Sequence, residues 1–301
     1  MSICLTTVVR LGHGHSLIEP ISKGDVRSCL CKSCSENSVD VECINKLSAR
    51  EIQSILNRTD PSGDLFEFHL RVSSPVVNIP ANVLSGRRFN RIFIYCSNDT
   101  PVTKLTIDPN AFRTSSHQTD TLRIFNCDMA QQADFAFLTD FVKLTRLSIK
   151  NSSNIESFEK LPHLHSLKVL TIFNCSGLGK MERFPIRAIP TGLKELDLAL
   201  NNLNDEKMEQ FLSSTASSPS ARTLEVLRLS GNRLTRIPDN NILSSLTSVG
   251  QLFFDGNIIP SIGSLEFSSR MPNLTVLNLM DMSLNSIEPS AFTHGKHYFI
   301  E

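Results

Sequence analysis

Clustered cysteines and paired histidines are the candidates for metal binding or crosslinking in this chain. Four of its eight cysteines, Cys29, Cys31, Cys34 and Cys43, cluster near the N-terminus. The Cys31-x-x-Cys34 spacing could bind zinc, but no second matching pair and no His-x-x-x-His follows it. A disulfide-linked segment is therefore the stronger prediction, and all three possible pairings of these four cysteines remain open.

Two histidine pairs, His13/His15 and His163/His165, suggest metal binding, but neither pair has further ligands nearby in the sequence. The chain contains no P-loop, G-x-S-x-G, H-E-x-x-H or dinucleotide-binding motif. We therefore expect no catalytic residues, no metal and no cofactor, and we expect that the protein is not an enzyme.

The cysteine cluster and the glycosylation acceptors together favour an oxidising compartment. Acceptors of the form Asn-x-Ser/Thr occur at Asn57, Asn98, Asn151, Asn174 and Asn273. The sequence thus predicts a secreted or extracellular glycoprotein. Residues 1–28 are predicted to be a leader or a disordered segment. As a signal peptide this segment is weak or truncated, because it lacks a basic flank and a clear cleavage site.

Overall charge and hydropathy restrict the classes of partner. The 301 residues carry 30 basic and 30 acidic side chains, so the formal net charge is +0. Because there is no overall positive field, we expect no nucleic-acid partner. No apolar run approaches the ~20 residues that a membrane-spanning helix requires, so we expect no membrane span in this chain.

A repeated pattern of leucines organises most of the chain. It is clearest at Leu224, Leu227, Leu229, Asn232 and Leu234, which read L-x-x-L-x-L-x-x-N-x-L. About nine copies follow when other apolar residues are allowed, with the second leucine position at Phe68, Ile92, Leu122, Leu147, Leu170, Leu196, Leu227, Leu252 and Leu277. An ordinary α/β protein with buried strands is the alternative, but it would not repeat one frame so often. The prediction is an α/β leucine-rich-repeat solenoid over 65–292, with a curved parallel sheet on the concave face and an irregular, partly helical convex side.

Inward-turning residues after each strand form a predicted ladder that bonds backbone groups of the next turn. Its members are Asn201, Asn232, Asn257, Cys127 and Cys175. We expect both cysteines to be buried structural thiols. Two repeats separate them, which places them ~10 Å apart and too far for a disulfide between them. A disulfide between Cys127 and Cys96, in the adjacent repeat, stays open.

The ends of a solenoid need atypical units that cover its core. Residues 29–64 are predicted to form a cysteine-rich N-terminal cap, with a capping box at Ser48 and Glu51 opening a helix to about Arg58. Residues 293–301 form a C-terminal tail. Within the repeats, the insertion at 205–220 is expected to form a helix over 205–212 and then a Ser-rich loop.

Alternation along each strand predicts which side chains line the concave face. In repeats two to five this face carries an unusual group of exposed aromatics interleaved with cations. The predicted binding patch is Arg71, Arg91, Phe93, Tyr95, Arg123, Phe125, Arg146, Lys150 and Phe173. Later repeats carry Glu195, Asp197, Glu225, Asp255 and Asp281 instead. Exposed aromatics beside arginines are typical of protein interfaces, and the alternative is an inert face that kept a few aromatics.

The cap, the frame and the Ala-Phe endings at Ala111-Phe112 and Ala291-Phe292 resemble extracellular leucine-rich-repeat proteins, including Toll-type ectodomains and small leucine-rich proteoglycans. The compact cap and the repeats at 122–127 and 170–175 look most like arthropod secreted proteins related to the non-catalytic subunit of oplophorus-type luciferase. That resemblance implies a scaffold or accessory role beside a separate catalytic chain, with a protein partner of unknown identity. The alternatives are an ectodomain fragment of a leucine-rich-repeat receptor and, last, an enzyme with an unrecognised site.

Overall fold

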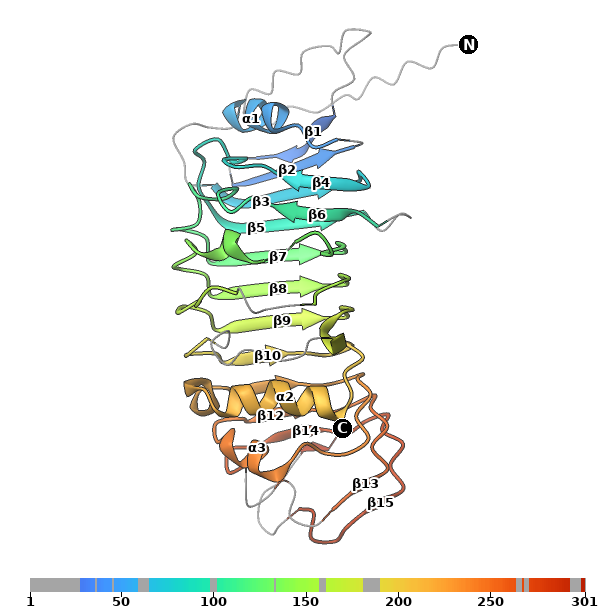
Figure 1. Ribbon diagram of the computed structural model, residues 1–301. Helices are drawn as coiled ribbons and strands as arrows, with labels where there is room; N and C mark the ends of the chain where they lie inside the picture. The colour runs from blue at the N-terminus through green and yellow to red at the C-terminus, as the bar shows by residue number, and fades with distance from the viewer. Residues whose placement is uncertain are drawn as a thin grey trace, which may run out of the picture.

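One long sheet organises the protein (Figure 1). The computed structural model describes residues 28–35, 37–44, 46–58, 65–97, 102–132, 134–156, 161–180, 190–263, 267, 271–292 and 299–300. Within them a 12-stranded sheet has the order β1-β2-β3-β5-β7-β8-β9-β10-β11-β12-β14-β16. The strands therefore follow one another in space nearly as they do in the sequence, which is the arrangement of a solenoid.

Nine strands of this sheet carry the nine predicted leucine positions. They are β3 Leu65–Val72, β5 Phe89–Cys96, β7 Thr121–Phe125, β8 Arg146–Lys150, β9 Val169–Phe173, β10 Glu195–Asp197, β11 Val226–Arg228, β12 Gln251–Phe253 and β14 Val276–Asn278. Each pairs in parallel with the next, and the second leucine positions lie directly opposite one another from Phe68 to Leu277. The predicted fold class is confirmed, and the frame positions of adjacent repeats pair in register.

The core lies along one face of the sheet. Successive strand residues point to opposite faces, and the frame leucines are buried, with Leu122, Leu196 and Leu227 at most 1% exposed. Their side chains join one continuous cluster that runs from the N-terminal strands to the last repeat. Burial of this aliphatic row is what holds consecutive turns together.

The N-terminal cap continues the sheet with two further strands. β1 Cys29–Cys34 runs antiparallel to β2 Ser38–Cys43, and β2 pairs in parallel with β3. Disulfides join Cys29 to Cys43 and Cys31 to Cys34, which resolves the three pairings that the sequence left open and leaves neither pair as free thiols for zinc.

Helix α1 Ala49–Arg58 covers the cap and places Ile52 and Leu56 in the core. Ser48 Oγ accepts a hydrogen bond from the backbone N–H of Glu51 at 3.4 Å. The Glu51 carboxylate accepts from the backbone N–H of Cys29 at 2.6 Å. Glu51 therefore ties the helix to strand β1 instead of closing the predicted capping box on Ser48.

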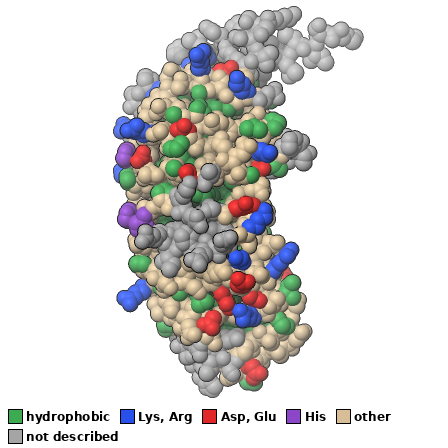
Figure 2. Space-filling view, viewed as in Figure 1, with side chains coloured by type: hydrophobic (Ala, Val, Ile, Leu, Met, Phe, Trp, Pro, Cys, Tyr) green, Lys and Arg blue, Asp and Glu red, His purple; other side chains and the backbone are tan. Residues whose placement is uncertain are grey.

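The side opposite the long sheet carries short elements (Figure 1). Its strand pairs are β4 Val76–Ile79 with β6 Lys104–Ile107, and β13 Ser261–Ile262 with β15 Ser286–Ile287. Its helices are α2 Asp205–Ala216, α3 Asn240–Ser245 and the 3-10 turns η1 Ala136–Leu138, η2 Leu178–Lys180 and η4 Pro219–Arg222. Charges of both signs are scattered over the face seen in Figure 2, with hydrophobic side chains in small separate groups.

The expected end of the helix at 212 is wrong. Helix α2 continues to Ala216, and within its last turn the hydroxyls of Ser214 and Thr215 donate to the carbonyls of Gln210 and Phe211, at 3.0 and 3.1 Å. Both side chains are buried with their hydroxyls satisfied inside the helix, so this segment packs as a helical turn instead of forming a solvated Ser-rich loop.

The last described strand, β16 Phe299–Ile300, pairs in parallel with β14 and extends the sheet. The remainder of the predicted tail, 293–298 and 301, lies outside the described residues, as do residues 1–27.

Candidate protein-binding surface

Buried asparagines lock the later turns to one another. Asn232 Oδ1 accepts from the backbone N–H groups of Asn201 and Leu203, each at 3.1 Å, and its Nδ2 donates to Leu198 O at 3.0 Å. Asn201 and Asn257 make equivalent bonds, Asn201 to Cys175 N and Ile172 O, and Asn257 to Leu234 N and Leu229 O. These contacts satisfy backbone groups that stacking would leave without partners.

A serine also takes part in this ladder, which the sequence frame missed. Ser152 Oγ accepts from Cys127 N at 3.2 Å and donates to Lys150 O at 3.0 Å. The repeat consensus has Asn or Cys at this position, so a serine was not recognised there. Its hydroxyl can nevertheless donate one hydrogen bond and accept one, as the amide of Asn does.

The prediction of a buried structural thiol is wrong for Cys127, which forms a disulfide with Cys96 of the preceding repeat. The Cα atoms lie 5.1 Å apart, because adjacent parallel strands bring them within bridging distance. Cys175 is a free, buried cysteine, and burial raises the pKa of its thiol to about 11. It is thus protonated and unreactive at neutral pH.

The concave face carries three rows of side chains that run across the strands. The central row is His69, Phe93, Arg123, Ser148, Thr171, Asp197, Arg228, Phe253 and Asn278. Beside it lie Arg71, Tyr95, Phe125, Lys150 and Phe173 on one flank, and Glu67, Arg91, Thr121, Arg146 and Val169 on the other. Every residue of the predicted binding patch therefore stands on this one face.

Rings of adjacent strands stack on one another over repeats one to three. The ring of His69 lies 4.5 Å from that of Phe93 with an interplanar angle of 6°, and Tyr95 lies 4.9 Å from Phe125 at 5°. Cations cover the outer ring faces, with the Arg71 guanidinium 4.5 Å from the Tyr95 centroid and Arg123 5.7 Å from that of Phe93. The rings thus present mainly their edges to solvent.

The expectation that Phe93 is exposed is wrong, because its side chain is only 8% exposed. It stays on the concave face and outside the aliphatic core. The stacked His69 ring on one side and Arg123 on the other shield it. Tyr95, Phe125 and Phe173 are partly exposed and remain available for contact.

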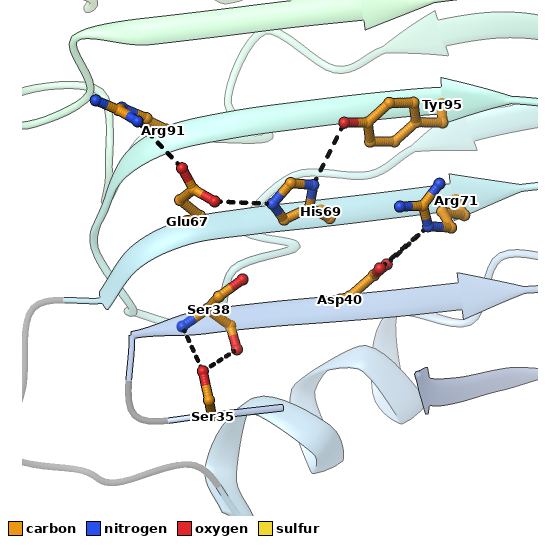
Figure 3. Close-up of polar contacts among 8 residues, drawn as sticks. All are labelled: Ser35, Ser38, Asp40, Glu67, His69, Arg71, Arg91 and Tyr95. Atoms are coloured by element: carbon orange, nitrogen blue, oxygen red, sulfur yellow. Dashed lines mark hydrogen bonds and ion pairs between the residues drawn. The ribbon is translucent and has the colours of Figure 1, made fainter. Parts of the chain in front are cut away.

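An ion-pair network surrounds the first rings (Figure 3). Glu67 accepts from Arg91 and contacts His69, each at 3.2 Å, while Tyr95 Oη lies 3.4 Å from His69 Nδ1. Arg71 Nε donates to both carboxylate oxygens of Asp40, at 3.0 and 3.1 Å. Burial raises the pKa of Tyr95, so its hydroxyl is neutral at physiological pH.

Sequence reasoning left Asp40, Glu67 and His69 out of the patch. Asp40 lies on β2, which carries no copy of the leucine frame, so nothing in the repeat pointed to it. Glu67 and His69 occupy concave positions of the first repeat. The position after Phe68 identifies His69 as a residue of this face, and the position before Phe68 would have identified Glu67.

Acidic side chains of the later repeats are partly neutralised within the face. Arg228 forms an ion pair with Glu195 and covers the ring of Phe253 at 5.0 Å. Asp255 accepts from Ser230 Oγ at 2.6 Å. Burial raises the pKa of Asp197, while a hydrogen bond from Ala199 N–H and the charge of Arg228 act in the opposite direction.

Glycosylation acceptors lie at the edge of this surface and elsewhere. Asn151 and Asn174 directly follow strands β8 and β9, are exposed, and are joined by a 3.0 Å bond from Asn174 Nδ2 to Asn151 Oδ1. Asn57 and Asn273 are exposed away from the sheet face, and Asn98 lies outside the described residues.

The histidine pairs supply no metal site in the described part of the chain. His163 and His165 are exposed neighbours whose ring centroids lie 4.2 Å apart, and His13 and His15 are not among the described residues. No group of three or more His, Cys, Asp or Glu side chains able to hold a metal ion occurs among the residues described. Across the same residues, no helix is both long and apolar enough to span a bilayer.

Solved structures with the same stacked architecture decide the fold. Toll in the Toll–Spatzle complex of Drosophila superposes with a TM-score of 0.51, at 15% identity over 88% of this chain and 37% of that one. The protein in the TLR13–ssRNA13 complex gives 0.53, at 19% identity over 80% of this chain and 31% of that one. The fold is a leucine-rich-repeat solenoid.

A curated relative supports the same assignment for this leucine-rich-repeat protein. The Oplophorus-luciferin 2-monooxygenase non-catalytic subunit of Oplophorus gracilirostris is 27% identical over 130 residues, which is 43% of this chain. The match spans 34% of that relative's length. No protein-family model matches the chain.

Proposed function

We propose that this leucine-rich-repeat protein is an extracellular, non-enzymatic accessory or scaffold protein that binds a protein partner on its concave face. The carrying observation is the row of partly exposed Tyr95, Phe125 and Phe173 beside arginines on one continuous sheet face. Aromatic and arginine side chains are enriched among the residues that anchor protein interfaces, because they bury a large contact area.

The compartment and the accessory role draw on further observations. Three disulfides join described cysteines, and disulfides persist mainly in oxidising compartments. The curated relative is a subunit named as non-catalytic, which supports an accessory role in a complex with another chain. The second candidate is a fragment of a receptor ectodomain, favoured by the likeness in fold to Toll.

The experiment compares partner recovery by two variants of the tagged, full chain from an extract of the source tissue. The triple variant Y95S/F125S/F173S removes the exposed rings and leaves the shielded Phe93 in place. Its control, V76S/V142S/I258S, removes three apolar side chains that are exposed away from the concave face. We expect the first variant to lose a protein that wild type and control both retain, with unchanged circular dichroism.

Equal recovery by both variants would contradict the proposal. Turnover of an added substrate by the purified chain alone would contradict the non-enzymatic role. A longer transcript that encodes an apolar helix after the repeats would favour the receptor alternative.

A further inference from the structure

Charges on most of the concave face are compensated by their neighbours. Arg71 pairs with Asp40, Arg91 with Glu67, and Arg228 with Glu195. The paired carboxylate offsets the positive charge of each guanidinium, so it attracts a further anion less strongly than an unpaired cation does. These cations are therefore poor candidates for direct recognition of a charged ligand.

Three cations in the middle of the face differ. Arg123, Arg146 and Lys150 stand on the adjacent strands β7 and β8, and no ion pair with a carboxylate involves any of them among the described residues. The Arg123 guanidinium lies over the ring of Phe93 and the Lys150 ammonium over that of Phe173; the charge of Lys150 also acts on the Asp197 carboxyl, without an ion pair between them. Like charges on neighbouring strands repel one another, so a negative ligand placed between them would relieve an existing cost.

A buried hydroxyl lies among these cations. Ser148 stands beside Arg123 on the next strand and is 6% exposed. Within the described residues, its Oγ is the buried side-chain polar atom that has no hydrogen-bond partner. An unsatisfied buried hydroxyl is unfavourable, and a carboxylate that displaces the side chains covering it would accept its hydrogen bond.

From these contacts we infer that the partner binds through a short acidic segment whose carboxylates lie among Arg123, Arg146 and Lys150, while the edges of Tyr95, Phe125 and Phe173 contact its apolar side chains. The inference rests on the concave face being the binding surface, as proposed above. It adds the chemistry of the partner and the three residues that recognise it.

The surroundings favour an acidic peptide over a nucleic acid. Carboxylates bound the cationic centre on both sides, with Asp40 and Glu67 toward the cap and Glu195, Asp197 and Asp255 toward the C-terminus. Most of these carboxylates are paired with arginines, so a continuous phosphate backbone would find no net positive charge on either side of the centre, whereas a short acidic segment needs only the centre itself. Bases need free ring faces for stacking, and here the rings stack on one another and under arginines.

The test uses fluorescence anisotropy with defined probes and the whole chain. The probes are a short labelled peptide of Glu, Tyr and Gly, the same peptide with Gln in place of Glu, and a single-stranded RNA of matched charge. The variant R123E/R146E/K150E reverses the cationic centre. Its control, K104E/R113E/K143E, makes the same change in net charge at exposed residues away from the concave face.

We expect the Glu peptide to bind wild type and control equally, and to bind R123E/R146E/K150E about tenfold or more weakly. The Gln peptide should bind weakly to wild type, variant and control, and added salt should weaken the binding of the Glu peptide to wild type. Equal Glu-peptide binding by both variants, tighter binding of the RNA, or no binding of any probe would overturn the inference.

The protein recovered from tissue separates this inference from the proposed function. A partner lost by Y95S/F125S/F173S but kept by R123E/R146E/K150E would contradict recognition through an acidic segment and would still support the concave face as the binding surface. A partner kept by both variants would overturn both proposals.

Discussion

Asn232 and Asn201, in consecutive turns of the solenoid, are joined by a 3.1 Å hydrogen bond from the backbone N–H of Asn201 to the side-chain oxygen of Asn232. The same oxygen accepts from Leu203 N, and the amide nitrogen donates to Leu198 O and Leu229 O. One side chain therefore hydrogen-bonds backbone groups of two consecutive turns.

Replacing Asn232 by Ala should lower the free energy of unfolding by about 2–4 kcal/mol, because it leaves several buried backbone groups without partners. Urea denaturation measures the change. Asn241→Ala, at an exposed position of α3, is the control and should shift stability by less than about 0.5 kcal/mol. Equal effects of the two substitutions would contradict the ladder's role.

The Cys96–Cys127 disulfide closes a loop of 31 residues in the sequence. The double variant C96S/C127S should lose about 3–4 kcal/mol of stability, because the unfolded chain regains the freedom that the crosslink removed. The measurement is chemical denaturation, together with mass spectrometry of the disulfide-linked peptide. Absence of that peptide from the oxidised protein would contradict the pairing.

Ser148 offers a substitution that should stabilise. Ser148→Ala removes the hydroxyl that has no partner and should raise the free energy of unfolding by about 1 kcal/mol. Ser152→Ala is the matched control, because it removes a hydroxyl that bonds Cys127 N and Lys150 O, and it should lose about 1 kcal/mol. Thermal unfolding of both variants checks the opposite signs, and a loss in both would show that Ser148 has a partner.

The buried carboxyl of Asp197 should make stability depend on pH. Because burial raises its pKa, the folded chain holds this proton more tightly than the unfolded chain, whose Asp titrates near about 3.9. The resulting stabilisation is complete below that value and is lost as the pH rises through the raised pKa.

Asp197→Asn removes this titration and keeps an oxygen to accept from Ala199 N–H. The variant should therefore melt at a higher temperature than wild type at neutral pH, and the difference should shrink below about pH 4. Melting curves across that range measure the difference. If the difference in melting temperature between variant and wild type grew on acidification, the ionised carboxylate would instead be stabilised in the folded protein.

Strand register could be predicted from the sequence because the leucine frame has a period of two within each strand. Reading the residue after each frame leucine gave the central row from His69 to Asn278, and the structure pairs those residues in that order. Contacts made by residues outside the frame could not be predicted in this way. Asp40 comes from a strand without the frame, and the bridge from Cys96 joins positions that differ within it.

Solvent exposure on the concave face was the weakest prediction. Alternation gives the direction of Phe93 but not the size of the neighbours that cover it, and His69 and Arg123 enclose the ring. The extra turn of α2 likewise depends on the burial of Ser214 and Thr215, whose hydroxyls usually favour β-turns and caps over helix interiors.

Each strand of the long sheet pairs only with the strands immediately before and after it. Cooperativity in such a stack is therefore nearest-neighbour in character, and a disturbance fades within a few turns. Shortening or lengthening the array by whole turns beyond β12 should leave the geometry around Tyr95 and Arg123 as it is, so that size and recognition can vary independently.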